Sequence, residues 1–276
     1  MFADYHVHTE FSDDSVYPME QAVQGAIAMG MDEICFTDHV DYGIKQDCDC
    51  GQPILYRGKE PLANVDYPMY VTKIRELQEQ YESKIQIRMG IEFGVQVHTI
   101  PLYKALVHKY FFDFIILSIH QVDDQEFWTQ DFQRGKSQKE YNEKYYQEML
   151  HVVKEYRDYS VLGHMDLIVR YDEKGEYPFG KVKPMIAEIL ETVIADGKGI
   201  ELNTSYHRYG LKNTMPSVDI LKLYRELGGE IITIGSDSHK AEHLGTYIEE
   251  GKLLLKELGF RYFCTYEKQQ PIFHST

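Results

Sequence analysis

Imidazole and carboxylate side chains recur directly after apolar runs of this sequence, and they are the residues best suited to chemistry. His6 and His8 end the first run, and because side chains alternate along a strand, both imidazoles would face one way and could share a cation. Later runs end in the same residue types. These further residues are Asp38, His39, Glu92, His120, His164, Asp237 and His239.

The composition of this set favours metal ligation over solvent-facing strand ends, which would also carry Lys, Ser and Asn. Mixed imidazole and carboxylate ligands suit Zn, Mn or Fe better than Mg or Ca. The number of donors exceeds the need of one ion, so we expect two or three metals. The remaining histidines except His207 are interpreted as structural or surface residues: His98, His108, His151, His243 and His274.

The apolar run 199–202 ends differently, in hydroxyl side chains followed by His207 and Arg208. The guanidinium of an arginine presents a fork of donors that matches phosphate oxygens. We therefore take Arg208 and His207 as candidate substrate-binding and catalytic residues, although a surface arginine is the simpler alternative for Arg208.

Seven short apolar segments that alternate with amphipathic ones would position these side chains. The expected strands are residues 2–7, 33–37, 85–91, 113–119, 160–162, 199–202 and 230–234. The expected helices are residues 19–29, 68–81, 102–110, 139–156, 182–196, 218–227 and 243–258. Asp66 is a candidate helix cap, and Ser137 with Glu140 forms a capping-box pattern.

Strand alternating with helix predicts a parallel sheet, in which the carboxyl ends of the strands form the active site. Seven such units without a long linker favour one closed or nearly closed barrel, a single domain over residues 1–276. A doubly wound open sheet is the alternative, since periodicity does not separate the two.

Composition limits the partners and the compartment. The formal net charge of −15 argues against nucleic acid or an anionic membrane as partner. No apolar run is long enough to span a bilayer and no export signal is visible. Four scattered cysteines do not make a disulfide framework, so we expect a cytoplasmic protein. No feature indicates an oligomeric state.

The connection between residues 41 and 64 is far longer than an ordinary loop between a strand and a helix. It is either an insertion without a role or, as we favour, a lid or substrate-recognition loop. Its Cys48-Asp49-Cys50 sequence could bind a soft metal, but without a second cysteine pair nearby two ordinary thiols are the better interpretation.

Taken in order, these motifs resemble the PHP family (polymerase and histidinol phosphatase domains). The matching stretches are His6-Val7-His8-Thr9, Ser12-Asp13-Asp14, Thr37-Asp38-His39, Gly90-Ile91-Glu92, Ser118-Ile119-His120, Gly163-His164, Glu201-Leu202-Asn203-Thr204-Ser205 and Gly235-Ser236-Asp237-Ser238-His239. They extend over essentially the whole chain. Its length, the Asp38-His39-Val40-Asp41-Tyr42 context and the lack of a polymerase region are similar to the stand-alone histidinol-phosphate phosphatases.

The resemblance implies a distorted (β/α)7 barrel with a trinuclear metal site of Zn, Mn or Fe. By motif, His6, His8, Glu92 and Asp237 would hold one ion, and Glu92 would bridge to a second held by His120 and His164. The third ion would lie on Asp14, His39 and His239. Asp13 is the alternative to Asp14, which we prefer because it follows His8 by six residues, as in relatives.

The implied activity is hydrolysis of a small phosphate monoester, L-histidinol phosphate in histidine biosynthesis, by a hydroxide that bridges two metals. Arg208 would neutralise phosphoryl oxygens, and Asp237, His207 and the metals are candidates to protonate the leaving group. Three divalent ions and three carboxylates leave a local charge of about +3, which at contact distance outweighs the diffuse acidic surface. The alternatives are another PHP phosphoesterase, acting on phosphotyrosyl protein or nucleotides, and a non-catalytic PHP module.

Overall fold

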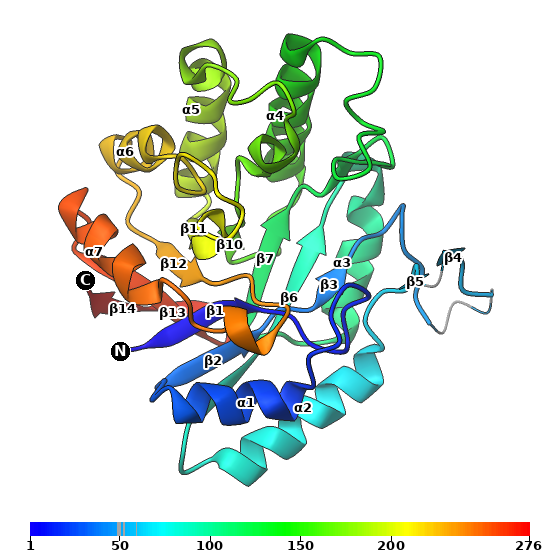
Figure 1. Cartoon of the computed structure of the whole chain (residues 1–276), viewed down its shortest axis with the longest axis vertical. Helices are drawn as coiled ribbons and strands as arrows, with labels where there is room; N and C mark the ends of the chain where they lie inside the picture. The colour runs from blue at the N-terminus through cyan, green and yellow to red at the C-terminus, as the bar shows by residue number, and fades with distance from the viewer. Residues whose placement is uncertain (49–50, 52, 59) are drawn as a thin grey trace.

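A parallel β-sheet that curls into a nearly closed barrel forms the centre of the computed structural model, which describes residues 1–48, 51, 53–58 and 60–276 (Figure 1). Its strands follow one another around the barrel in chain order. They are β1 (Ala3–Val7), β2 (Glu33–Phe36), β6 (Gln86–Gly94), β7 (Phe114–Ser118), β10 (Val161–Leu162), β11 (Gly199–Asn203) and β12 (Ile232–Gly235). The short strand β3 (His39–Val40) also pairs with β6.

The first and last strands of the sheet meet, which confirms the barrel and excludes the open doubly wound sheet. Two backbone hydrogen bonds join them, from the His8 amide to the Ser238 carbonyl at 2.8 Å and from the Ser238 amide to the His6 carbonyl at 3.1 Å. The buried carboxylate of Asp4 reinforces this seam. It accepts hydrogen bonds from the Ser236 amide at 2.8 Å, the Ser236 hydroxyl at 2.5 Å and the Gly245 amide at 2.9 Å.

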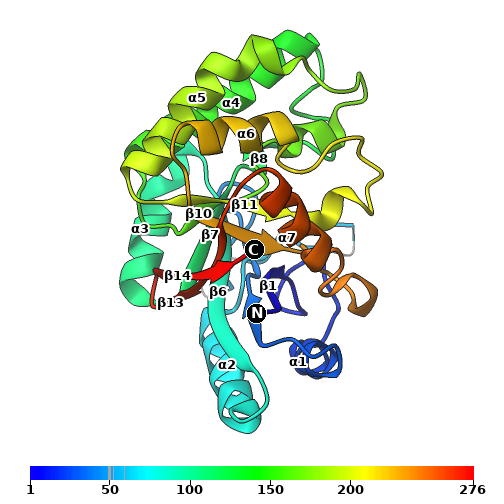
Figure 2. The same ribbon diagram turned by 90° about the vertical axis from the view of Figure 1, so that its left-hand side faces the viewer.

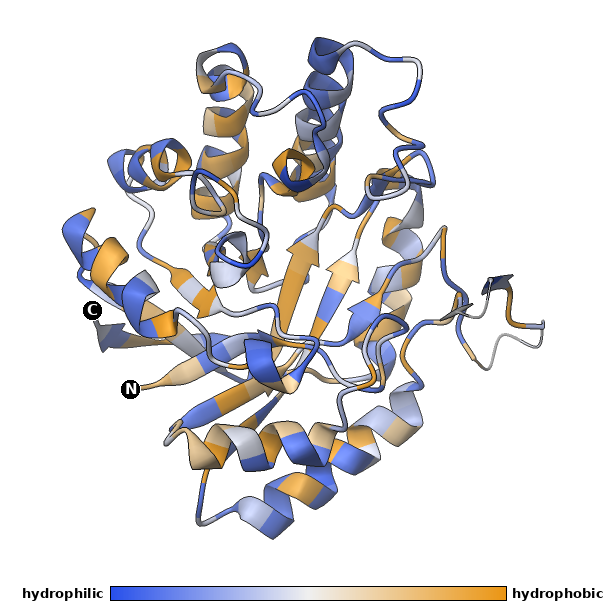
Figure 3. Ribbon diagram, viewed as in Figure 1, coloured by the Kyte–Doolittle hydropathy of each residue, from blue (hydrophilic) through white to orange (hydrophobic). Residues whose placement is uncertain are grey.

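Helices surround the barrel, and their apolar faces pack against it (Figures 2 and 3). They are α1 (Met19–Ala28), α2 (Tyr67–Tyr81), α3 (Ile100–Lys109), α4 (Gln138–Glu155), α5 (Phe179–Ala195), α6 (Val218–Glu226) and α7 (Ile248–Glu257). Asp66 caps α2 by accepting from the Met69 amide, and Ser137 with Glu140 forms the expected capping box on α4. None of these helices, nor any other in the described part of the chain, could cross a membrane.

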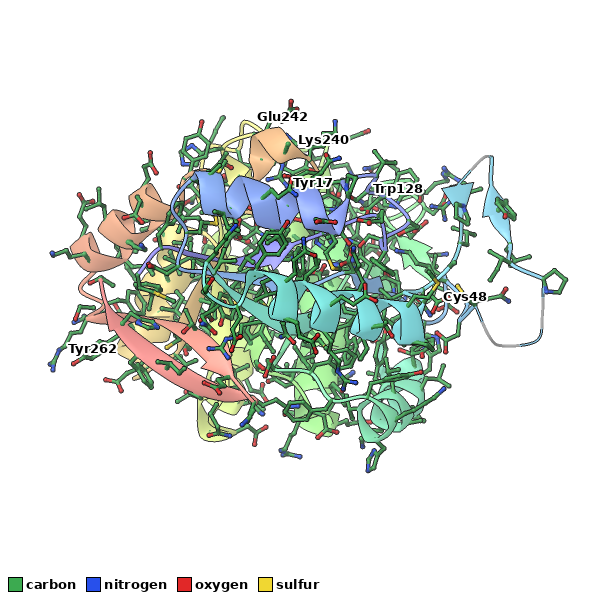
Figure 4. The ribbon with its side chains drawn as sticks, turned by 90° about the horizontal axis from the view of Figure 1, so that it is seen from below. Tyr17, Cys48, Trp128, Lys240, Glu242 and Tyr262 are labelled. Atoms are coloured by element: carbon green, nitrogen blue, oxygen red, sulfur yellow. The ribbon has the colours of Figure 1, made fainter. Side chains whose placement is uncertain are left out.

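The C-terminal hairpin of β13 (Tyr262–Glu267) and β14 (Gln270–Ser275) is the longest of the elements that the sequence patterns do not predict. It covers the amino ends of the barrel strands, where the Tyr266 ring lies 5.0 Å from that of Phe114 and the Tyr266 amide donates to the Tyr5 hydroxyl at 2.6 Å. Tyr262 lies on its outer edge (Figure 4). The hairpin therefore leaves the carboxyl ends of the strands free for a functional site.

The connection 41–64 is described in part. Its hairpin, β4 (Tyr56–Arg57) with β5 (Glu60–Pro61), is joined to the hairpin of β8 (Gln121–Val122) and β9 (Gln125–Glu126). Arg57 forms an ion pair with Glu126, and its guanidinium lies 4.8 Å from the centre of the Trp128 ring. Of the cysteine pair, the Cys48 thiol donates to the Asn64 carbonyl, and the other member, at position 50, lies outside the described residues.

The substitution Asp4→Ala should weaken the seam between the first and last strands. It leaves three amides, those of Ser236, Gly245 and His6, and the Ser236 hydroxyl without their acceptor, and each such loss at a buried group costs on the order of 1–3 kcal/mol. We expect the free energy of unfolding to fall by about 3 kcal/mol or more, measured by urea denaturation. Asp158→Ala, at an exposed position, is the control; equal stability of the two variants would contradict the role of Asp4.

Candidate metal centre

Four overlapping groups of possible metal ligands lie at the carboxyl ends of the barrel strands. Within each group the ligand atoms lie within 4.8 Å of one another. The groups found among the described residues are His6–Glu92–His164, His6–His8–Asp237, His8–His39–His239 and His39–Asp41–His120. Eight of the nine sequence-predicted ligands belong to them, and the ninth, Asp14, lies beside two of the same histidines.

Glu92, on β6, occupies the centre of the cluster and is fully buried. Its Oε1 lies 2.9 Å from His164 Nε2 and 3.2 Å from His120 Nε2. Its Oε2 lies 3.2 Å from His6 Nε2 and 3.1 Å from His39 Nδ1. The two oxygens of one carboxylate thus face two different sets of imidazoles, which is the arrangement that a ligand bridging two cations requires.

Several atoms of the cluster fit a bound metal because they lack any other partner. His6 Nε2, His8 Nε2, His39 Nδ1 and Glu92 Oε2 are buried, and although Glu92 Oε2 lies close to two of these nitrogens, none of the four atoms forms a hydrogen bond of acceptable geometry in the described structure. Leaving such atoms unpaired is costly, and native proteins rarely do so without a ligand or ion. The residues present therefore fit a centre that holds more than one divalent metal ion.

The opposite ring nitrogens of three histidines contact acceptors that fix their orientation. His6 Nδ1 lies 2.5 Å from Glu201 Oε1, His120 Nδ1 lies 2.7 Å from Asp41 Oδ1, and His239 Nδ1 lies 3.0 Å from the Asp237 carbonyl. Metal-ligating histidines commonly donate their second ring N–H in this way. In each case the arrangement directs Nε2 toward the cluster.

Asp14 and Asp13 have different surroundings, which bears on the choice between them. Asp14 Oδ2 lies 3.0 Å from His239 Nε2 and 3.6 Å from His39 Nε2. Asp13 instead accepts a hydrogen bond from Lys45 Nζ at 2.5 Å. The geometry favours Asp14 as the ligand and gives Asp13 the role of pairing with a buried lysine.

Burial and neighbouring charges set the protonation of the cluster. Burial, together with the charges of His239 and His39, lowers the pKa of His8 well below its ordinary value, so this imidazole is neutral and able to bind metal. Burial alone would raise the pKa of Glu92, but the surrounding histidines, His6 first, hold it well below the ordinary value. The carboxylate is therefore ionised, as metal ligation requires.

Two arginines lie on one side of the cluster, next to Asp237. Arg170 Nη2 lies 3.1 Å from Asp237 Oδ2 and donates to Ser205 Oγ at 2.6 Å. Arg208 donates to the carbonyls of Ser236 and Asp237. The Tyr209 ring centre lies 4.0 Å from the Arg170 guanidinium and 5.2 Å from that of Arg208. Together the two cations make this side of the centre suited to an anion.

His207 lies apart from this arrangement. Its exposed ring stacks on Tyr247 with a centroid distance of 3.7 Å and on Tyr206 at 4.2 Å. The contacts described for His207 include none with the candidate metal ligands. Its predicted catalytic and substrate-binding role gains no support from its position.

Four residues close to the centre escaped the sequence interpretation. Asp41 is two residues beyond His39, a spacing that could have revealed it, and Glu201 is a carboxylate inside an apolar strand. Lys45 and Arg170 carry no such signal, since Arg170 lies on a short 3-10 turn, η2 (Leu167–Tyr171), after His164.

Asp38, at a predicted strand end, supports the loop 9–12 by accepting from the Thr9 amide at 2.6 Å and the Ser12 hydroxyl at 2.7 Å.

Comparisons with known proteins agree with this site. The PHP domain family matches residues 4–205. A histidinol-phosphatase of Lactococcus lactis is 31% identical over 269 residues, which cover 95% of this chain and 93% of the relative. A probable histidinol-phosphatase of Clostridium acetobutylicum is 28% identical over 251 residues, 89% of each chain. This chain therefore belongs to the PHP family.

Two solved structures are similar to this chain. The crystal structure of the Lactococcus lactis histidinol phosphate phosphatase, complexed with Zn, L-histidinol and phosphate, superposes with a TM-score of 0.84 at 29% identity and covers 98% of both chains. A putative histidinol phosphatase of Listeria monocytogenes has a TM-score of 0.70 at 20% identity, covering 90% of this chain and 99% of that one, and shows the shared fold.

Replacing Asp41 tests whether it orients His120. We expect Asp41→Ala to weaken metal affinity by about 10–100-fold, as the loss of a residue that hydrogen-bonds to a metal ligand commonly does. The number of metals bound at saturation should stay the same. Competition with a chelator measures this affinity. The matched control is Asp123→Ala, which removes a 61% exposed carboxylate that pairs with Lys144. An unchanged affinity in the Asp41 variant would refute the role.

Proposed function

We propose that this protein hydrolyses L-histidinol phosphate to L-histidinol and phosphate, a reaction of histidine biosynthesis, in the cytoplasm and within one catalytic domain over residues 1–276. The observation that carries the proposal is the Glu92-centred cluster of imidazoles with two arginines beside it. A multi-cation centre next to two guanidinium groups is complementary to a phosphate monoester dianion.

The relatives support the choice of substrate. The Lactococcus lactis enzyme, similar over nearly the whole of both chains, is a histidinol-phosphatase, and its crystal structure holds Zn, L-histidinol and phosphate. The net charge of −15 does not argue against an anionic substrate, because the positive charge of the metal centre acts on the phosphate at contact distance.

Three divalent metal ions are proposed for the centre, with Zn as the first choice and Mn or Fe as alternatives. His6, His8 and Asp237 would hold one, His120 and His164 a second, and Asp14, His39 and His239 the third, with Glu92 shared. When bound, such ions lower the pKa of a coordinated water to about 7 and neutralise phosphoryl oxygens.

The residues of the chain position the substrate and the charge. We propose that Arg170 and Arg208, whose guanidinium groups lie 3.1 and 3.6 Å from Asp237 Oδ2, hold phosphoryl oxygens and stabilise the charge that redistributes in the transition state. His6, Arg170 and Arg208 offset the effect of burial and hold the pKa of Asp237 well below its ordinary value. An ionised Asp237 accepts rather than donates a proton, so we favour Asp237 as a ligand over Asp237 as the general acid.

A substrate panel tests the activity directly. Zinc-, manganese- or iron-loaded protein should release phosphate from L-histidinol phosphate with a kcat/KM at least 100-fold above those for phosphotyrosyl peptide and nucleoside monophosphates. Colorimetric phosphate release measures this ratio. Equal rates on the whole panel would indicate a different PHP phosphoesterase, and no release from any ester would indicate a non-catalytic PHP module.

Substitution of Arg170 tests the anion-binding side of the centre. Arg170→Met should lower kcat/KM for L-histidinol phosphate by about 10²–10³-fold, because a charge that faces the transition state is lost. Metal content, measured by plasma mass spectrometry, should stay at the wild-type level. Arg157→Met, which removes an arginine paired with Asp196 far along the chain, is the control. Wild-type kinetics in the Arg170 variant would contradict the proposed role.

A further inference from the structure

A cavity of about 200 Å³ lies outside the metal centre, among the start of α5, the start of α6 and the turn η2. Its lining includes none of the candidate metal ligands. Three carboxylates, Asp166, Glu176 and Asp219, share the lining with apolar side chains such as Val182 and Ile220. No Lys, Arg or His is found among the described residues that line it.

Asp166 carries the chemistry of this cavity. Its side chain is buried, with 5% of its surface exposed, and its Oδ2 accepts a hydrogen bond from the Ser217 amide at 2.7 Å. Its Oδ1 is buried and has no hydrogen-bond partner within the described chain. The hydroxyl of Tyr177, which lines the same cavity, is likewise buried without a partner there. Leaving a buried polar atom unpaired is costly, so the carboxylate oxygen points to a missing donor and the hydroxyl to a missing partner.

The charge of the cavity indicates a cation. Glu176 and Asp219 are exposed to solvent, so the carboxylate that needs a partner is the buried Asp166, and no ion pair neutralises it in the described part of the structure. Arg170, on the same turn as Asp166, is paired with Asp237 instead. Lys181 and Lys183 lie over the rings of Tyr177 and Phe179, at 5.2 and 6.0 Å, and do not line the cavity.

The spacing of the donors favours an organic cation over a metal ion. Asp166 belongs to none of the groups of described residues whose ligand atoms lie within 4.8 Å of one another. The apolar part of the wall would also remain unused by a bare ion, whereas it would bury the hydrocarbon portion of an amine.

We propose that this cavity is a second binding site, for a small organic ammonium ion. Its N–H groups donate to Asp166 Oδ1 and to the Tyr177 hydroxyl, and its hydrocarbon part lies against the apolar wall. The site adjoins the anion-binding side of the metal centre, because Met215 lines the cavity and its sulfur lies 3.6 Å from Arg170 Nη2. The proposal does not depend on the substrate assigned above.

The test uses metal-loaded, phosphate-saturated full-length protein labelled at its methionine methyl groups, with the Met215 signal assigned through Met215→Leu. Isoamylamine, a primary ammonium without an imidazole, is the probe. It should shift the Met215 signal saturably, while isoamyl alcohol and isovalerate, of the same shape, should bind at least tenfold more weakly. Either of two results would overturn the proposal: equal binding of the neutral alcohol, which would show that the cavity does not recognise the positive charge, or no shift with the amine, which would indicate that water alone fills the cavity.

A matched pair of variants tests the residue that carries the site. Asp166→Asn keeps an acceptor for the Ser217 amide but replaces the unpaired oxygen with a donor, so amine affinity should fall at least tenfold. Glu173→Gln, which removes an exposed carboxylate outside the cavity lining, should bind the amine as the wild type does. Unchanged affinity in the Asp166 variant would overturn the proposal. Failure of the wild-type protein to hydrolyse L-histidinol phosphate would contradict the proposed function, and the amine-binding result would still stand.

Discussion

A fully buried carboxylate that faces four imidazoles is stable only if positive charge lies between them, and Glu92 is in this position. Its two oxygens lie at hydrogen-bond-like distances from ring nitrogens of four histidines that come from four different segments of the barrel edge. Protonating the imidazoles would supply that charge, and so would divalent cations. His8 favours the second solution, because burial disfavours a proton on its ring and its buried Nε2 has no hydrogen-bond partner in the described structure.

Residues outside the cluster orient its ligands and balance their charges. Glu201 and Asp41 hold histidine rings from behind, and Lys45 neutralises Asp41 and Asp13 at once. Asp4 closes the barrel next to His6, so the two strands that carry His6 and Asp237 stay in register. The C-terminal hairpin covers the opposite end. The hydrogen bonds of Asp4 therefore stabilise the seam and also position the strands that carry the ligands His6 and Asp237.

Much of the site could be predicted because its ligands recur at the ends of the regularly spaced apolar segments. Parallel barrel strands end at one edge, so the polar residues at or near the ends of apolar runs gather there, and the sequence predicts His6, Glu92, His120 and Asp237 from position and residue type. Asp14 was found through family resemblance, and its place opposite His239 and His39 fits that choice.

The residues that sequence patterns missed depend on contacts between distant segments. Arg170 reaches Asp237 across 67 positions of sequence from a turn with no regular period, and no local pattern encodes that contact. The C-terminal hairpin was missed for a related reason, since its partner surface, around Tyr5 and Phe114, is formed only when the barrel closes. The role of His207 stays a prediction, since its ring stacks on Tyr247 and no described contact joins it to the metal ligands.

Anomalous diffraction at the zinc edge, from crystals of the zinc-loaded protein, tests the central claim most directly. Our account predicts three peaks, with Glu92 in contact with two of them and Zn–N distances of about 2.1 Å to the histidines of the cluster. A single peak, or peaks that leave Glu92 without a metal, would contradict the account.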